Sequence, residues 1–174
     1  MSTAIVTLFA IALMLVGVLT WSNASYSSID SGIQSWKQMV EAAEEVARTD
    51  VEITGAQMQA PFVEVLVQNS GKIQLAQFPN WDVLVQYYSG NSTYNISSLV
   101  YTGNVIPSDN EWAVATIYSD DSLGQQEVFD PGILSPGEVM LMKLNLNPQP
   151  GAGTTNRVTL STPNGVVAMA QFSG

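Results

Sequence analysis

The first residues of the chain, from Met1 to Ile29, include no charged side chain, although the protein as a whole is acidic. Within this stretch residues 4–19, AIVTLFAIALMLVGVL, are apolar apart from Thr7 and Gly17. At about 1.5 Å per residue, roughly 20 such residues form a helix long enough to cross a bilayer. A helix that is apolar on every side must be buried on every side. The class of protein to which the chain belongs therefore depends on what buries this helix.

Three surroundings are compatible with this segment. A cleaved secretory signal carries a basic stretch before its apolar run, but no Lys or Arg precedes Lys37. A permanent transmembrane anchor is oriented by flanking basic residues, which are also absent from this flank. The third is a helix that crosses the membrane only during biogenesis and then packs against copies of itself in a filament. The uncharged flank favours the third, and lipid stays open as the alternative.

The apolar pattern continues beyond the length that a bilayer needs. Apolar residues recur at alternating spacings of four and three, which is a heptad-like stripe on a helix. This pattern predicts that the helix runs to about Arg48. The charged residues on this stretch occupy other positions, so it is amphipathic. The stripe consists of Ile29, Ile33, Trp36, Val40, Ala43 and Ala47.

Composition excludes several classes of function. The 174 residues include 15 acidic and 5 basic side chains, which gives a net charge of −10. Binding of nucleic acid or of an anionic membrane surface depends on clustered Lys and Arg, so we expect no nucleic-acid partner. The chain contains no Cys and no His. It therefore lacks disulfides, thiolate metal sites and the Ser-His-Asp and Cys-His arrangements of nucleophilic catalysis.

After Arg48 the pattern changes to short, β-rich runs separated by turn signals such as Asn69-Ser70-Gly71. With no second helix, these runs predict an antiparallel sandwich or barrel. The fold class expected is α+β: a long N-terminal hydrophobic helix, residues 1–50, followed by an antiparallel, Ig-like β-sandwich head, residues 51–174. The predicted strands are 51–59, 62–68, 82–88, 94–101, 111–118, 138–146, 156–162 and 166–172.

Four passages resemble archaeal flagellins (archaellins), which belong to the broader type IV pilin-like group. They are AIVTLFAIALMLVGVL (4–19), FVEVLVQNSGKIQL (62–75), FDPGILSPGEVMLMKLNL (129–146) and VTLSTPNGVVAMAQF (158–172). The resemblance implies a structural filament subunit rather than an enzyme. It also implies a short basic leader that a prepilin-type peptidase removes, so we expect the numbering to begin at the mature chain. Bacterial type IV pilins usually carry a glutamate near the mature N-terminus, where this chain has Ile5, and this difference favours an archaellin-like assembly.

Several acidic side chains could form a catalytic or metal-binding site, but for each of them a place in a turn or loop is the simpler interpretation. Asp120, Asp121 and Glu127 could form a glycosidase-like carboxylate pair, but they fall where acidic residues form turns. Asp109 and Asn110, together with the two aspartates, could bind calcium, but their spacing matches no EF-hand. We therefore expect no catalytic residue, no metal site and no cofactor.

Three Asn-x-Ser/Thr triplets match the acceptor pattern for N-glycosylation. Asn91 and Asn95 adjoin a predicted turn and are the expected acceptors. Asn23 lies on the helix, where packing should block it.

The leading hypothesis is an extracellular, cell-surface homopolymer assembled through its apolar helix, with membrane contact only during biogenesis. The alternative is a membrane-anchored adhesin, pilin or stator-like module whose head binds a ligand, for example sugar on Trp81, Tyr87 and Tyr88. The residues expected to pack in the filament core are Ile5, Leu8, Phe9, Ile11, Leu13, Leu15, Val16, Leu19, Trp21, Ile29, Ile33 and Trp36.

Overall fold

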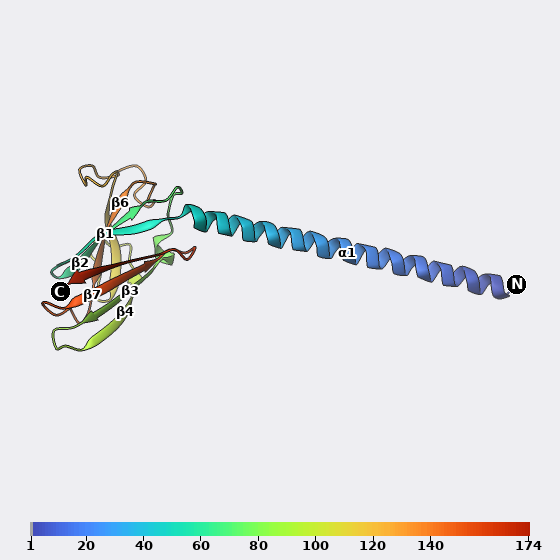
Figure 1. Ribbon diagram of the computed structural model, residues 1–174, viewed down its shortest axis with the longest axis horizontal. Helices are drawn as coiled ribbons and strands as arrows, with labels where there is room; N and C mark the ends of the chain where they lie inside the picture. Colours follow the sequence, from blue (N-terminus) through green and yellow to red (C-terminus); the bar gives the residue numbers. More distant parts are fainter. Residues whose placement is uncertain (1) are drawn as a thin grey trace. The chain divides into compact units, whose positions relative to one another are not determined.

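The computed structural model describes residues 2–174; Met1, the first residue of the predicted core segment 1–50, lies outside the described residues. Residues 2–174 form one α-helix, one short 3-10 helix and eight strands, whose arrangement Figure 1 shows. By its internal contacts the chain divides after Ala43 into two compact units, the second being Glu44–Gly174.

The helix α1 spans Ser2–Arg48 without interruption. Its end is fixed by groups of the second unit. The Thr49 hydroxyl donates a hydrogen bond to the Glu45 carbonyl oxygen at 2.9 Å, and the Lys72 N–H donates to the Arg48 carbonyl oxygen at 2.8 Å. A Cβ atom at Gly71 would lie 2.7 Å from that same Arg48 oxygen, so only glycine fits this approach. The predicted helix and its end near Arg48 are confirmed.

The strands are found where the alternation predicted them. Residue alternation is clearest in β2, where every second side chain is buried, as expected for a strand with one face on a core. A 3-10 turn, Phe78–Asn80, precedes β3 and has no counterpart in the sequence prediction. The bounds are β1 Val51–Gln59, β2 Phe62–Asn69, β3 Asp82–Tyr88, β4 Tyr94–Tyr101, β5 Glu111–Tyr118, β6 Val139–Asn145, β7 Thr155–Ser161 and β8 Val167–Ser173.

The strand order is β1-β2-β6-β5-β4-β3-β7-β8. All neighbours are antiparallel except β4 and β5, which run parallel and pair only at Val100 with Glu111 and Tyr101 with Trp112. Residues 102–110 connect the two strands, and β5 then runs in the same direction as β4 beside its last residues, which makes the pair parallel. The end strands β1 and β8 lie close together, so the sheet is nearly closed. The α+β class is confirmed, and the purely antiparallel head is corrected to a mixed sheet.

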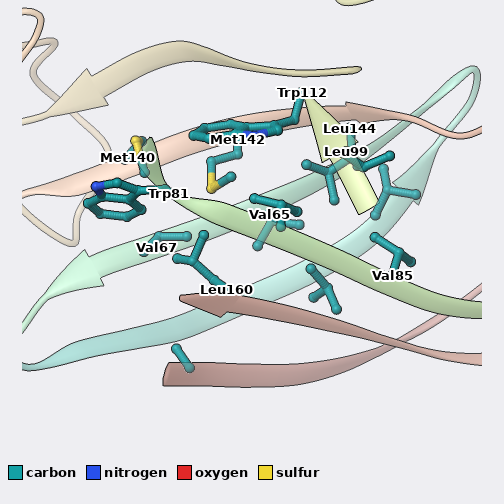
Figure 2. Packing of buried hydrophobic residues seen from close by; sticks show 14 of the residues in the cluster. Val65, Val67, Trp81, Val85, Leu99, Trp112, Met140, Met142, Leu144 and Leu160 are labelled. Atoms are coloured by element: carbon teal, nitrogen blue, oxygen red, sulfur yellow. The ribbon is translucent and has the colours of Figure 1, made fainter. Parts of the chain in front are cut away.

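The core of the head lies between the two halves of this sheet. Figure 2 shows side chains from different strands converging there, among them Val65 of β2, Met142 of β6 and Leu160 of β7. Trp112 of β5 is fully buried and meets Tyr101 edge to face, with ring centroids 4.9 Å apart. The head therefore has a complete hydrophobic core of its own.

Candidate assembly interface

The side chains predicted to pack in a filament core are exposed in the single chain. Their exposed fractions range from 51% at Ile33 to 77% at Trp21. Soluble monomers seldom expose a continuous apolar surface of more than a few hundred Å². The segment that carries these residues is also long and apolar enough to cross a membrane by length and composition. Such a surface requires cover from lipid or from other protein chains.

The apolar part of α1 satisfies its own polar groups. Between Ala4 and Trp21 the hydroxyls belong to Thr7 and Thr20 alone. The Thr7 hydroxyl donates to the Thr3 carbonyl oxygen at 2.8 Å, and the Thr20 hydroxyl donates to the Val16 carbonyl oxygen at 2.9 Å. Because backbone groups inside a helix are also paired, the part of this segment from Val6 to Thr20 needs no polar partner from outside. It can be buried against a dry surface at no hydrogen-bonding cost.

The heptad-like stripe is also open. Ile29, Ile33 and Trp36 have exposed fractions of 59%, 51% and 67%. Hydroxyls on this part of the helix again bond backward, as in Ser31 to the Ser27 carbonyl oxygen and Ser35 to the Ser31 carbonyl oxygen, both at 2.9 Å. Apolar side chains therefore remain as the groups that a neighbour could cover along this stripe.

The structure separates the residues considered for calcium into two groups. Asp109 accepts a hydrogen bond from the Asn147 side chain at 2.6 Å, which ties together two loops at one end of β5. Asp120 lies beyond the other end of β5 and accepts hydrogen bonds from the backbone and hydroxyl of Ser122. The strand between them spans roughly 25 Å, so the two groups cannot share one ion. Within residues 2–174, no three Asp or Glu side chains are grouped so as to hold a metal.

Glu127, considered as half of a catalytic pair, is engaged in local structure. Its carboxylate accepts a hydrogen bond from the Phe129 N–H at 2.6 Å. This bond lowers the pKa of Glu127 below its usual value. A general acid needs the opposite shift, toward neutral pH, so the environment of Glu127 suits a turn and not proton transfer.

The aromatic sugar site of the alternative hypothesis does not form. Trp81 and Tyr87 have exposed fractions of 3% and 1%, and the Trp81 indole N–H donates to the Ala76 carbonyl oxygen at 3.0 Å. Only Tyr88 is accessible, and its ring lies 5.2 Å from that of Tyr94. Two of the three aromatics therefore belong to the core, which is where aromatic residues of a β-sandwich more often lie.

The expected glycosylation sites differ in their surroundings. Asn91 is exposed in the turn between β3 and β4, and its side-chain oxygen accepts hydrogen bonds from Ser89 and from the Thr93 N–H. Asn95 lies half-buried on β4, and its amide nitrogen donates to Ser89 and to the Thr93 carbonyl oxygen. Since a glycan is attached to that nitrogen, Asn91 is the one of these two residues with a free attachment atom. Asn23 is exposed on α1 in the single chain.

Fold and surface together define a class of protein: a compact β head that carries a long N-terminal helix with an apolar, internally satisfied surface. No protein-family model matches the sequence, and no curated protein matches it.

Solved structures do match. A chain of the archaellum periplasmic stator protein complex FlaF and FlaG from Sulfolobus acidocaldarius is 17% identical, and the match covers 70% of this chain and 87% of that chain with a TM-score of 0.50. The archaeal flagellin FlaB1 from Methanocaldococcus jannaschii is 12% identical over 72% of this chain and 89% of its own, with a TM-score of 0.49. The archaeal flagellum of Methanospirillum hungatei strain JF1 is 11% identical over 94% and 90%, with a TM-score of 0.47.

The similarity to the stator complex shows a shared fold. The predicted likeness to archaellum proteins is thereby confirmed for the fold.

Proposed function

We propose that this protein is a structural subunit of an extracellular, archaellum-like filament, in which copies of α1 pack against one another. The observation that carries the proposal is the apolar surface of residues 4–21, which is exposed on every side and leaves no hydroxyl without a partner. Identical copies can cover such a surface as completely as lipid does. The fold shared with a chain of the archaellum stator complex supports an archaellum-related role.

The energetics of burial are sufficient for assembly. Complete burial of a large apolar side chain stabilises by roughly 1.5–3 kcal/mol. Each of the predicted core residues is at least half exposed in the single chain, so burial of the remainder contributes about 1–2 kcal/mol per side chain. Summed over the predicted core residues this gives roughly 12–24 kcal/mol, against about 4–15 kcal/mol for lost translational and rotational freedom. Relative to a chain exposed in water, the balance favours a filament, whereas a chain that starts in lipid gains no hydrophobic burial and must be held in the filament by packing contacts.

Symmetry then determines the form of the product. Identical chains related by one rotation and one axial rise make heterologous contacts that do not close, and repetition of such contacts gives a helix. In this proposal the membrane holds α1 only before assembly, the partner of each chain is another copy, and the role is not enzymatic.

A second candidate function is a membrane-anchored, stator-like component of an archaellum. It is supported by the fold shared with the FlaF–FlaG stator complex and by the membrane-competent length of α1. In that case the helix stays in lipid and the head binds another archaellum protein.

Shearing of intact cells distinguishes the two. We expect the chain in fibres that are released by shear and sediment without detergent, detected by mass spectrometry and by electron microscopy. Recovery of the chain only from detergent-solubilised membranes would exclude the filament proposal and support the stator-like one.

A further inference from the structure

The strand β4 has a free edge along most of its length. On one side it pairs with β3 over residues Tyr94–Leu99 without a bulge. On the other side it meets β5 only at Val100 and Tyr101. Figure 1 shows β4 at the rim of the head. Residues 94–98 therefore have a neighbouring strand on one side only.

The backbone groups on this free side can be identified from the adjoining pair. The Val100 N–H points to the β5 side, where it donates to the Asn110 carbonyl oxygen at 3.1 Å. Because successive residues of a strand direct their backbone groups to alternate sides, the N–H and C=O groups of Ile96 and Ser98 point the same way as those of Val100. Within residues 2–174 no hydrogen bond engages these groups of Ile96 and Ser98.

The free edge of β4 lacks the features that usually protect such an edge. Sheets commonly protect an edge with Lys, Pro, a bulge or a covering segment. The residues of β4, YNISSLVY, include no charge and no Pro. Elsewhere in the head, the end strands β1 and β8 lie close together, and Gln126 pairs with Tyr118 at the end of β5. The free edge of β4 is therefore open to the addition of another strand.

The charge distribution of the head indicates which strand can be added. Residues 49–174 carry 11 acidic and 3 basic side chains, yet residues 83–108 include no charged residue. Two heads repel one another through their net negative charge, and they do so least where this uncharged stretch faces its own copy. Tyr94 and Ile96 have exposed fractions of 50% and 58%, so the same approach also buries apolar surface. These observations favour a second copy of β4 as the occupant.

We propose that β4 pairs antiparallel with β4 of a second copy and thereby joins the heads of chains in two adjacent filaments, an inference that rests on the proposed function. The free backbone groups match when Ile96 lies opposite its own copy and Tyr94 lies opposite Ser98. The two Ile96 side chains then lie side by side on one face. Each copy uses the same edge, so the contact is closed. It therefore cannot lengthen a filament and links one filament with another.

The contact is weak between isolated heads and stronger between filaments. A pairing of five residues from each copy is smaller than a stable interface of roughly 1,200–2,000 Å², so we expect a dissociation constant of about 0.1–1 mM. Isolated heads are then monomers at the micromolar concentrations of a chromatography column. Filaments present the edge many times, and this repetition raises the avidity of a weak contact.

Disulfide crosslinking tests the register on the fragment Glu44–Gly174, which contains the complete core. The chain has no cysteine, so a single introduced cysteine can only link two copies. Opposite Cα atoms of paired strands lie about 5.5 Å apart, within the roughly 4.4–6.8 Å that a disulfide spans. At about 1 mM and without glycans, Ile96→Cys should form linked dimers at least about tenfold faster than the control Met169→Cys, whose site on β8 is 61% exposed.

A second cysteine position tests the same register from within β4. Ser98→Cys should crosslink as slowly as the control, since its two copies would lie about 13 Å apart along the paired strands. Equal rates for Ile96→Cys and Met169→Cys would overturn the pairing of β4 with its copy.

Sedimentation of full-length chains separates lateral joining from assembly, because bundles pellet at low speed and single filaments only at high speed. Ile96→Lys places two like charges opposite one another, so we expect the low-speed fraction to fall at least about fivefold. The total that pellets at high speed should stay unchanged. The matched control Met169→Lys adds the same charge at similar exposure and should keep the low-speed fraction within about twofold of wild type.

The outcomes distinguish this inference from the proposed function. Wild-type filaments that never pellet at low speed, or an equal loss in the two lysine variants, would overturn the role of β4 and leave the filament intact. A wild-type chain that does not pellet even at high speed would contradict the filament and with it the joining of filaments.

Discussion

Leu13→Lys places a charge in the middle of the apolar segment of α1. Leu13 has an exposed fraction of 62% in the single chain, so its burial in a filament contributes about 1–2 kcal/mol. The new ammonium has no partner on its own helix, because the nearest carboxylate, that of Asp30, is about 25 Å away along the axis. An unpaired charge in an apolar interior costs several kcal/mol.

Together the lost burial and the unpaired charge amount to at least about 5 kcal/mol per subunit, which weakens subunit addition by more than a thousandfold. We therefore expect no filaments from Leu13→Lys in sheared material or in sedimentation after detergent removal. The head should remain folded, since it has a core of its own, and its thermal unfolding should be unchanged.

Two control variants separate the effects of charge and volume. Leu13→Met keeps the volume and should assemble normally. Gln34→Lys adds the same charge at an already polar position outside the stripe and should also assemble. Filaments of normal yield from Leu13→Lys would refute the assignment of this segment to the filament core.

Three further outcomes are expected. In the fragment Glu44–Gly174, Asn69→Ala should lower the free energy of unfolding by about 2–4 kcal/mol, because the fully buried Asn69 amide donates to the Ile73 and Leu134 carbonyl oxygens, both at 2.8 Å. Urea titration measures this loss. A loss no greater than that of the exposed control Asn104→Ala would contradict the prediction. The same fragment should elute as a monomer in size-exclusion chromatography without detergent, whereas polymers would show that the head suffices for assembly. If the chain is glycosylated in its native host, Asn91→Gln should remove the glycan mass in intact-protein mass spectrometry and Asn95→Gln should leave it unchanged; the reverse result would contradict the hydrogen-bond argument.

The helix and the strands were predictable because each is encoded locally. Alternation in residues 62–68 and the four-three spacing from Ile29 to Ala47 depend on neighbours in the sequence, and the structure follows both. The parallel contact between β4 and β5 was not predictable, since alternation states which face of a strand is buried but not which strand lies beside it. Strand order is set by contacts between residues that are distant in the sequence, such as the pairing of Val83 on β3 with Leu160 on β7.

The apolar surface of α1 was predictable for the same reason, whereas the side-chain hydrogen bonds of the head were not. A run of apolar residues on a helix identifies an apolar surface from the local sequence alone. Every residue assigned to the interface lies on one element, α1. By contrast, the sequence indicates Asn69 only as one residue of a turn, whereas its side chain also joins that turn to Leu134, 65 residues away. Asn91 and Asn95 match the same glycosylation pattern, and only their hydrogen bonds distinguish them.

The central claim is that copies of the same helix, and not lipid, surround residues 4–21. It is tested most directly by an electron cryomicroscopy reconstruction of native filaments purified from the cell surface by shear. The account predicts that this chain forms the lattice, with Leu8, Leu13 and Val16 in contact with neighbouring copies of α1 and the β heads outside the helical core. Cell-surface filaments built from another protein, with this chain left as a membrane-bound monomer, would contradict it.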